Sequence, residues 1–480
     1  MKRDSRHSPP LKRRRRTRAA LALLGGLGLG VVGLLGPTAS PAQAAESAST
    51  HAVDIPVQKH VLKNGLTVLM SPDHSLPVVA VEVRYLVGSA YEVKGKSGFA
   101  HLFEHLMFQG SEHFNHEYFA PFEPIGGVVN GTTNTDRTNY FERVPSQYLE
   151  LALWMESDRM FGLLPTLDQA KLDNQRDVVK NERRQSYENR PYGMFWFYLS
   201  EAMYPEGHPY RHLTIGSHDD LTHASLDDVK AFFKQYYNPA NAVLTLVGDF
   251  KPEDAKELIE KYFDQASTGS RSTPVKAEPV KLQGVKHLEY TDAVAAPKVY
   301  FAWPTPALYA DGDAALDVLA SVLSDGKTSR LYKPLVFDQK IAKDVSAYQA
   351  SSQLGSVFVV EATAADKKTS ADKLGKAVFA ALKQALSKPP TQDELERSLN
   401  GWKKSFYGRI EGVLSRAQLL STYYHFTGDP DYVSKDLARY TAVGAKQVEA
   451  AEKFLDLENY VRIDISPGKK PEISDSMGGG

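Results

Sequence analysis

The sequence contains no cysteine among its 480 residues. This absence excludes structural disulfides, thiolate zinc sites and cysteine nucleophiles together, so any metal site must use histidine and carboxylate ligands. An overall excess of one charge is also lacking, because 57 Lys and Arg residues stand against 58 Asp and Glu residues. With 42% hydrophobic residues, the chain has the length and composition of a globular protein with two or more cored domains.

The basic residues are unevenly distributed along the chain. Nine of them, but only one acidic residue, fall within residues 1–44, so the rest of the chain is net acidic. Binding to a nucleic-acid backbone requires a basic surface. The composition therefore argues against a nucleic-acid partner.

The first 44 residues have the pattern of an export signal. The basic run Lys12–Arg18 precedes the uncharged run Ala19–Gly36, and small residues continue to Ala44, after which we expect cleavage. The alternative is that the 18-residue uncharged run is retained as a membrane anchor, although its six glycines weaken it as a span. We therefore predict a periplasmic or secreted protein, with no membrane contact unless this segment is retained.

The remainder of the chain has the pattern of a duplicated α+β domain. A helix followed by a strand over residues 229–248 recurs over 448–466, and an apolar helix ending in glycine over 98–110 recurs over 314–326. A segment rich in Ser, Thr and Pro separates the two halves. The predicted organisation is a signal peptide (1–44), a polar lead-in (45–56), an N-terminal zinc-binding domain (57–266), a linker (267–280), a C-terminal homologous domain without metal ligands (281–470) and a flexible tail (471–480).

Four segments of the first half have clear local patterns. Alternating residues around Asn64-Gly65 predict a hairpin over 57–70, and a β-branched run predicts a strand over 78–87. Helical spacing over 98–108 stops at Gln109-Gly110, and a long charged helix is predicted over 167–189.

The helix predicted over 98–108 carries the strongest chemical pattern, His101-Leu-Phe-Glu104-His105. Residues four apart on a helix project from one face, so the imidazoles of His101 and His105 can converge on one ion. Glu104 lies on the same side, where its carboxylate can accept a proton from an attacking water without being a ligand. This order of residues, H-x-x-E-H, is the inverted zinc-peptidase signature. Because the rest of the helix is apolar, these polar groups need partners, and a metal supplies one.

A catalytic zinc needs a third protein ligand while one position stays open. The long charged helix offers Glu182, Glu188 and Asp177, and the residues alone do not separate them.

Together these features resemble the insulinase/pitrilysin family of inverted zinc peptidases, in the branch of two-domain subunits that includes the mitochondrial processing peptidases. The resemblance extends from about Val57 to Pro467. In that family a ligand glutamate follows the motif after 76 further residues, and this count leads from His105 to Glu182. The resemblance therefore implies one Zn²⁺ per chain held by His101, His105 and Glu182.

The resemblance also implies a fold and a substrate site. The expected fold is α+β, with two homologous domains that each pack a mostly antiparallel sheet with helices and together form half of a clamshell. The segment Gly126–Thr133 with Thr138-Asn139-Tyr140 resembles the family's substrate-binding edge strand, which implies substrate contacts at Asn130, Gly131 and Thr132. An extended peptide can add to such an edge through backbone hydrogen bonds. A hairpin that binds no ligand is the alternative interpretation of this segment.

The chain departs from the family pattern in two places. The family often has a glutamate seven residues before the third ligand, where this chain has Gln175, and an amide cannot orient a ligand by charge. Active members also carry an Arg and, seven residues later, a Tyr in the second half, but the matching positions are Val336 and Lys343. A shift in this alignment would bring Arg330 or Tyr332 into that role instead.

In the heteromeric branch of this family one subunit contributes the zinc helix and a second, metal-free subunit contributes the Arg/Tyr pair, so the resemblance implies a division of labour between two subunits. The second-half counterparts of His101, Glu104 and His105 are Asp317, Ala320 and Ser321, so only the first half is expected to bind zinc. The resulting hypothesis is an exported zinc metalloendopeptidase subunit that requires a homologous, metal-free partner carrying the Arg/Tyr pair. The alternatives are a non-catalytic scaffold subunit of a processing complex and a zinc hydrolase of non-peptide substrates.

Overall fold

A computed structural model describes residues 53–266 and 269–479. The predicted signal peptide and most of the lead-in lie outside the described residues. Among the described residues, no helix is both long and apolar enough to cross a membrane.

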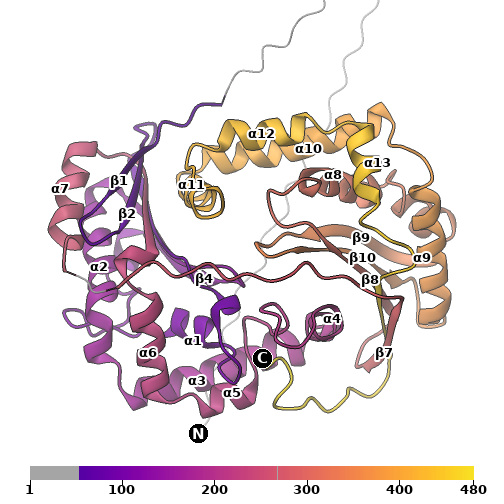
Figure 1. Cartoon of the computed structure of the whole chain (residues 1–480), viewed down its shortest axis with the longest axis horizontal. Coiled ribbons are helices and arrows are strands. Elements are labelled where there is room, and N and C mark those ends of the chain that lie inside the picture. Colours follow the sequence, from indigo (N-terminus) through magenta and orange to yellow (C-terminus); the bar gives the residue numbers. More distant parts are fainter. Residues whose placement is uncertain (1–52, 267–268, 480) are drawn as a thin grey trace, which may run out of the picture. The chain divides into compact units, whose positions relative to one another are not determined.

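Two sheets organise the described chain (Figure 1). The strand order of the second sheet matches that of the first without β1. The first has the order β1-β2-β6-β3-β5-β4 and the second the order β7-β11-β8-β10-β9. In each sheet the last strand of the half pairs in parallel with an early one, β6 with β2 and β11 with β7, and every other pairing is antiparallel. The strands are β1 (Gln58–Val61), β2 (Thr67–Pro72), β3 (Val78–Tyr85), β4 (Val128–Thr133), β5 (Thr138–Pro145), β6 (Ala242–Gly248), β7 (Lys286–Asp292), β8 (Lys298–Thr305), β9 (Ala342–Ala350), β10 (Ser356–Ala364) and β11 (Val461–Pro467).

The helices follow the strands in a matching order in the two halves. Those of the first half are α1 (Phe99–Leu106), α2 (Leu149–Thr166), α3 (Gln169–Arg183), α4 (Phe195–Met203), α5 (His218–His223), α6 (Leu226–Tyr236) and α7 (Pro252–Phe263). Those of the second half are α8 (Asp313–Ser324), α9 (Ala371–Ala385), α10 (Gln392–Glu411), α11 (Val413–Thr427), α12 (Val433–Thr441) and α13 (Ala445–Glu452). The short helical turns are Ser89–Tyr91, Glu123–Ile125, Ser146–Tyr148, η4 (Arg184–Glu188), Pro239–Asn241 and Lys333–Asp338.

The local expectations from the sequence are confirmed with small shifts of the boundaries. Strands β1 and β2 form the hairpin around Asn64-Gly65, with Gly65 at a φ of 90°. Helix α1 occupies the segment expected to bind metal, and its second-half counterpart α8 also ends before a glycine of positive φ, Gly326. The long charged helix is α3, which ends at Arg183 and continues as the π-helical turn η4.

Each half contributes one helix to the sheet of the other half (Figure 1). Helix α4 of the first half packs against the second sheet, where Phe195 stacks on Tyr300 with ring centroids 3.8 Å apart. Helix α11 of the second half packs against the first sheet, and its Leu420 lies in one buried cluster with Ala80 and Val243. This exchange joins the two sheets through buried apolar contacts, which are the main source of stability in such interfaces.

The segment 471–479, which the sequence predicts to be a flexible tail, contacts the first half. The carbonyl oxygen of Met477 accepts a hydrogen bond of 2.7 Å from Arg183 in α3. The carbonyl oxygen of Asp475 accepts one of 3.0 Å from the amide of Asp219 in α5. The side chains of Ile473 and Met477 also pack against the first hydrophobic core. These contacts bring the end of the described chain to the residue that follows Glu182.

Candidate metal centre

Helix α1 presents His101, Glu104 and His105, and its position is fixed at its N-terminus. Gly98 precedes the helix with a φ of 89°, in the left-handed region that favours glycine. A Cβ on Gly98 would lie 3.0 Å from the Cα of Gly216, so these two glycines allow the start of α1 to approach the neighbouring loop closely. The apolar side of α1, including Leu102, is fully buried against the sheet, and the polar residues therefore face away from it.

Helix α3 presents Glu182 near its C-terminal end. The helix begins at the N-cap Asp168, whose side chain accepts a hydrogen bond from the amide of Lys171 at 2.9 Å. Leu172 and Val179 are buried and lie on the side of α3 that packs against the core beneath α1. Glu182 is one turn beyond Val179, so its carboxylate extends toward α1.

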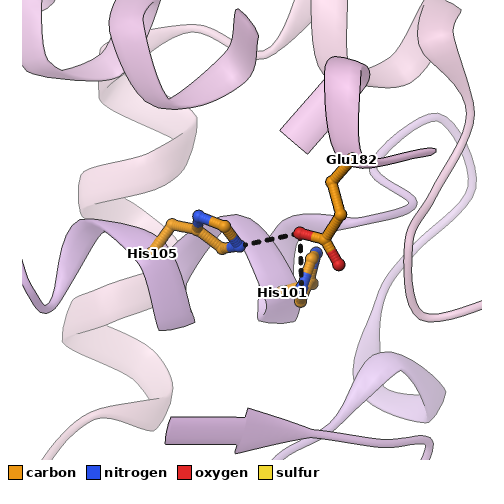
Figure 2. Close-up of side chains that lie close together, drawn as sticks. All are labelled: His101, His105 and Glu182. Atoms are coloured by element: carbon orange, nitrogen blue, oxygen red, sulfur yellow. Dashed lines mark ion pairs between the residues drawn. The ribbon is translucent and has the colours of Figure 1, made fainter. Parts of the chain in front are cut away.

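The side chains of His101, His105 and Glu182 converge on one point between α1 and α3 (Figure 2). The Oε2 atom of Glu182 lies 3.7 Å from Nε2 of His101 and 3.3 Å from Nε2 of His105. Ligand atoms at about 2.1 Å from a tetrahedrally coordinated ion lie about 3.4 Å from one another. The two observed separations are close to that value, so the three donor atoms fit a single ion with two nitrogen ligands and one oxygen ligand.

The local electrostatics favour metal binding over protonation of His101. Burial and the adjacent His105 lower the pKa of His101 to about 4. A neutral imidazole is the form that donates its lone pair to a metal. The hydrogen bond from His105, together with both imidazoles, lowers the pKa of Glu182 and keeps that carboxylate ionised. The shifted pKa values of His101 and Glu182 therefore favour the neutral imidazole and the ionised carboxylate that a divalent cation requires.

The other ring nitrogen of His101 lacks a partner. Its Nδ1 atom is buried without a hydrogen bond among the described residues. Metal-binding histidines usually donate this second N–H to a carboxylate or carbonyl group. Gln175, where the family often has a glutamate, is buried, and its side-chain amide donates to Asn174 at 2.8 Å. Within the described chain, the side chain of Gln175 forms no hydrogen bond to His101, His105 or Glu182.

Glu104 lies beside the three converging groups and is held by a residue that the sequence analysis missed. The hydroxyl of Thr133 in β4 donates a hydrogen bond of 2.5 Å to Oε2 of Glu104. Burial raises the pKa of Glu104, and the Thr133 bond and nearby charges, including His105, offset part of this effect. Thr133 belongs to the segment compared with the family's edge strand, but its pairing with Glu104 depends on how β4 passes α1, which the sequence pattern does not specify.

The proposed substrate residues lie on β4, at the edge of the first sheet. The side chain of Asn130 accepts a hydrogen bond from the amide of Gly131 at 2.9 Å, and the hydroxyl of Thr132 donates to Asn139 at 2.6 Å. The polar side chains of Asn130 and Thr132 therefore already have partners in the hairpin. A peptide that added to this edge would also contact the β4 backbone.

Two family models match the sequence in succession. The model described as insulinase (peptidase family M16) matches residues 67–214, which include all four residues of the candidate centre, and the model described as the peptidase M16 inactive domain matches residues 223–401. Zinc protease PqqE of Helicobacter pylori is 32% identical over 383 residues, which cover 78% of this chain and 85% of that protein. The chain belongs to the insulinase (M16) family.

Another relative and a solved structure are similar to most of the chain. An uncharacterized zinc protease, YmxG of Bacillus subtilis, is 23% identical over 415 residues, which cover 86% of this chain and 98% of that protein. The crystal structure of a protease from Helicobacter pylori superposes with a TM-score of 0.80 at 28% identity, covering 86% of this chain and all of that one (100%). The likeness to solved structures supports the α+β fold with two mixed sheets.

The second half has the M16 fold without a counterpart of the metal centre. Asp317, which the sequence comparison of the two halves aligns with His101, accepts a hydrogen bond from Tyr440, and burial raises its pKa to about 6. Ala320 is buried, and Ser321 lies next to it on α8. The described second half therefore brings no histidine to the place equivalent to the metal centre.

The two positions aligned with the family's Arg/Tyr pair carry Val336 and Lys343 instead. Val336 packs against the hydrophobic core of the second half, and the side chain of Lys343 is 62% exposed. Arg330 is engaged within the second half: its guanidinium binds both carboxylate oxygens of Glu394, at 2.8 and 2.7 Å, and three backbone carbonyls. Arg330 is thus not free to bind a substrate. The structure therefore does not support the shifted alignment, in which Arg330 would take the role of the family's Arg.

A second group of possible metal ligands lies on the other sheet. The ligand atoms of His287, Glu289 and Asp464 lie within 4.8 Å of one another. Arg462 occupies both oxygens of Asp464, however, at 2.9 and 2.6 Å. Since a guanidinium already neutralises the buried carboxylate, this group is a much poorer cation site than the centre on α1 and α3.

Proposed function

We propose that this chain is an exported zinc metalloendopeptidase subunit that hydrolyses peptide bonds in extended or unfolded peptides. The observation that carries the proposal is the convergence of His101, His105 and Glu182 beside a separate carboxylate, Glu104. Two relatives, PqqE of Helicobacter pylori and YmxG of Bacillus subtilis, are named as zinc proteases, which supports the same chemistry.

The three converging side chains would hold one Zn²⁺ per chain. Two imidazoles and one carboxylate form a ligand set that suits zinc, and three protein ligands leave a coordination position open, as in catalytic sites. When bound, zinc acts as a Lewis acid that polarises a carbonyl and lowers the pKa of water toward about 7.

Glu104 supplies the proton transfers. Its carboxylate is adjacent to the candidate ligands in the chain, and Thr133 holds one of its oxygens at 2.5 Å. In the proposed mechanism the other oxygen accepts the proton of the water that attacks the scissile carbonyl. Glu104 then passes this proton to the leaving nitrogen. Its raised pKa suits this role, because a weakly basic carboxylate would be a poor proton acceptor near neutral pH.

The edge strand β4 would bind the substrate as an added strand. Backbone hydrogen bonds along Asn130, Gly131 and Thr132 would fix an extended peptide with little dependence on its side chains. Since folded proteins do not present free extended segments, this mode favours unfolded or flexible peptides.

A homologous, metal-free partner subunit would complete the site. The lack of Arg and Tyr at Val336 and Lys343, together with the engagement of Arg330, leaves the developing oxyanion without those side-chain donors from this chain. The loss of one such donor typically costs about 10²–10³ in turnover. The purified chain should therefore gain peptidase activity when it is mixed with a metal-free homologue that carries the Arg/Tyr pair, and full activity of the chain alone would refute the division of labour.

The proposal that the chain is exported rests on the sequence of residues 1–44 alone, which lie outside the described residues. The basic run, the uncharged run and the small residues before Ala44 support a periplasmic or secreted location.

The substitution Glu104→Gln tests the proposed function directly. The variant should bind zinc like the wild-type chain but lose peptide hydrolysis, measured with a peptide library in the presence of the partner. Glu123→Gln, at an exposed glutamate of the same half, serves as the matched control and should keep full activity. Unchanged turnover in Glu104→Gln would exclude this residue as the base. A zinc-free wild-type chain would favour the scaffold function instead.

A further inference from the structure

The β4–β5 hairpin, residues 128–145, connects the candidate catalytic base to the second half of the chain. Its first strand carries Thr133, which donates to Glu104. Its turn, residues 134–137, contacts both halves of the molecule. The hairpin is therefore the element through which a shift of the second half would reach the base.

The first connection runs through a buried carboxylate in the neighbouring strand. Asn139 of β5 donates a hydrogen bond of 2.7 Å to Oε1 of Glu82 in β3. The other oxygen, Oε2, accepts a hydrogen bond of 2.6 Å from the hydroxyl of Ser421 in α11. Arg84, which forms an ion pair with Glu82, also donates to the carbonyl of Gln418 at 3.2 Å. A fully buried carboxylate is thus shared between the hairpin and a helix of the second half.

The second connection is at the turn of the hairpin. Asp136 accepts a hydrogen bond from the hydroxyl of Tyr210 in the first half and one of 3.0 Å from the amide of Gln353 in the loop between β9 and β10. The same Tyr210 hydroxyl also accepts from the amide of Leu354 at 3.0 Å. The turn is therefore held on one side by the first half and on the other by the second.

Within the hairpin, Arg137 links these anchors to the strand that holds Glu104. Its guanidinium donates to the carbonyl of Thr132 at 2.7 Å and to the side chain of Asn139 at 2.9 Å. Thr132 is the chain neighbour of Thr133, and Asp136 is the chain neighbour of Arg137. Arg137 therefore links Thr133, which binds the Glu104 carboxylate, to both Asn139 and Asp136.

From these contacts we infer that the second half positions Glu104 and the edge strand β4 through the β4–β5 hairpin, with Ser421 as a positioning residue. The role given to Glu104 in this inference rests on the proposed function. The coupling between the second half and the hairpin rests only on the hydrogen bonds described above. It gives the half without metal ligands a specific task at the catalytic centre. Buried hydrogen bonds to a carboxylate suit this task, because leaving such an acceptor unpaired is costly and fixes one arrangement.

Amide hydrogen exchange of the full-length chain tests the coupling without relying on catalysis. Ser421→Ala removes the hydroxyl that binds Glu82, and we expect about tenfold faster exchange of the amides in 128–145. Exchange in helix α9, on the far side of the second sheet, should stay unchanged. Ser415→Ala, at a partly exposed serine of the same helix whose hydroxyl donates to the carbonyl of Gly412, is the matched control and should leave the hairpin unchanged.

Three outcomes decide between the inference and its alternatives. Faster exchange confined to the hairpin, with an unchanged zinc content and a lower kcat, supports Ser421 as a positioning residue. Unchanged exchange in the hairpin overturns the inference. An equal acceleration in the hairpin and in α9 also overturns it, because Ser421 would then act only on global stability. If the wild-type chain hydrolyses no peptide, the exchange result still decides the coupling, so failure of the proposed function is recognised separately.

Discussion

The carboxylate of Glu92 binds the backbone amide of Ala100, with Oε1 2.7 Å from the nitrogen, one residue before His101. Its other oxygen accepts from the amide of Gly98 at 2.9 Å and lies 3.0 Å from Nε2 of His212. Glu92 therefore satisfies free N–H groups at the start of α1 and places a negative charge at the positive end of the helix dipole. The first candidate ligand, His101, is thus positioned by a residue outside the H-x-x-E-H motif.

The substitution Glu92→Gln should loosen the start of α1. It removes the charge that is paired with His212 in a buried site, and breaking such a pair typically costs about 3 kcal/mol. We expect a lower free energy of unfolding in urea and weaker zinc binding in a competition titration. Glu117→Gln, at an exposed glutamate of the same half, should change neither quantity. If zinc affinity were the same in Glu92→Gln and the wild type, the capping contact would have no role in positioning His101.

Gln175→Glu should tighten zinc binding. The residue lies two turns before Glu182 on α3, next to α1, and Nδ1 of His101 is buried without a partner among the described residues. A carboxylate in this region can accept that N–H and make the imidazole a better donor, and such interactions are typically worth about 10–100-fold in metal affinity. Gln169→Glu, at an exposed position on the same helix, controls for the added charge. Equal zinc affinities for the two variants would mean that position 175 does not influence His101.

The pair formed by Arg330 and Glu394 should contribute stability in a pH-dependent way. The hydrogen bonds from Arg330 lower the pKa of Glu394 from 4.5 to about 2. Because the folded-state pKa lies below the unfolded value, the contribution is fully present above about pH 4.5 and is lost as the pH falls toward 2. Arg330→Met should therefore destabilise the chain by about 2 kcal/mol at pH 7 and by less at pH 3, as measured by urea unfolding.

The same variant tests the shifted alignment of the Arg/Tyr pair. Arg330→Met should retain the peptidase activity seen with the partner subunit, since its guanidinium is engaged by Glu394 and backbone carbonyls. If the variant stays folded under the assay conditions but loses hydrolysis, substrate binding would instead be assigned to Arg330.

Local sequence patterns were sufficient for much of the fold. The hairpin around Asn64-Gly65 follows from a turn dipeptide with a positive φ, and α1 follows from its apolar spacing. The shared strand order of the two sheets agrees with the repeat at offsets near 216 residues. Each of these features depends on residues close together in the chain or on direct comparison of the two halves.

Contacts between distant segments could not be derived in this way. Spacing alone left Glu182, Glu188 and Asp177 equivalent, and the family resemblance was needed to select Glu182. In the structure Glu188 instead binds Arg183 and His218, each at 2.8 Å. The hold of Thr133 on Glu104 and the exchange of α4 and α11 between the sheets depend on tertiary packing, for which a single sequence carries no periodic pattern.

Anomalous diffraction at the zinc absorption edge, from crystals of the zinc-loaded chain, is the most direct test of the metal centre. The account predicts one peak per chain between His101, His105 and Glu182, at about 2.0–2.2 Å from the two Nε2 atoms and the carboxylate oxygen. A peak at His287, Glu289 and Asp464, or no ordered zinc between α1 and α3, would contradict it.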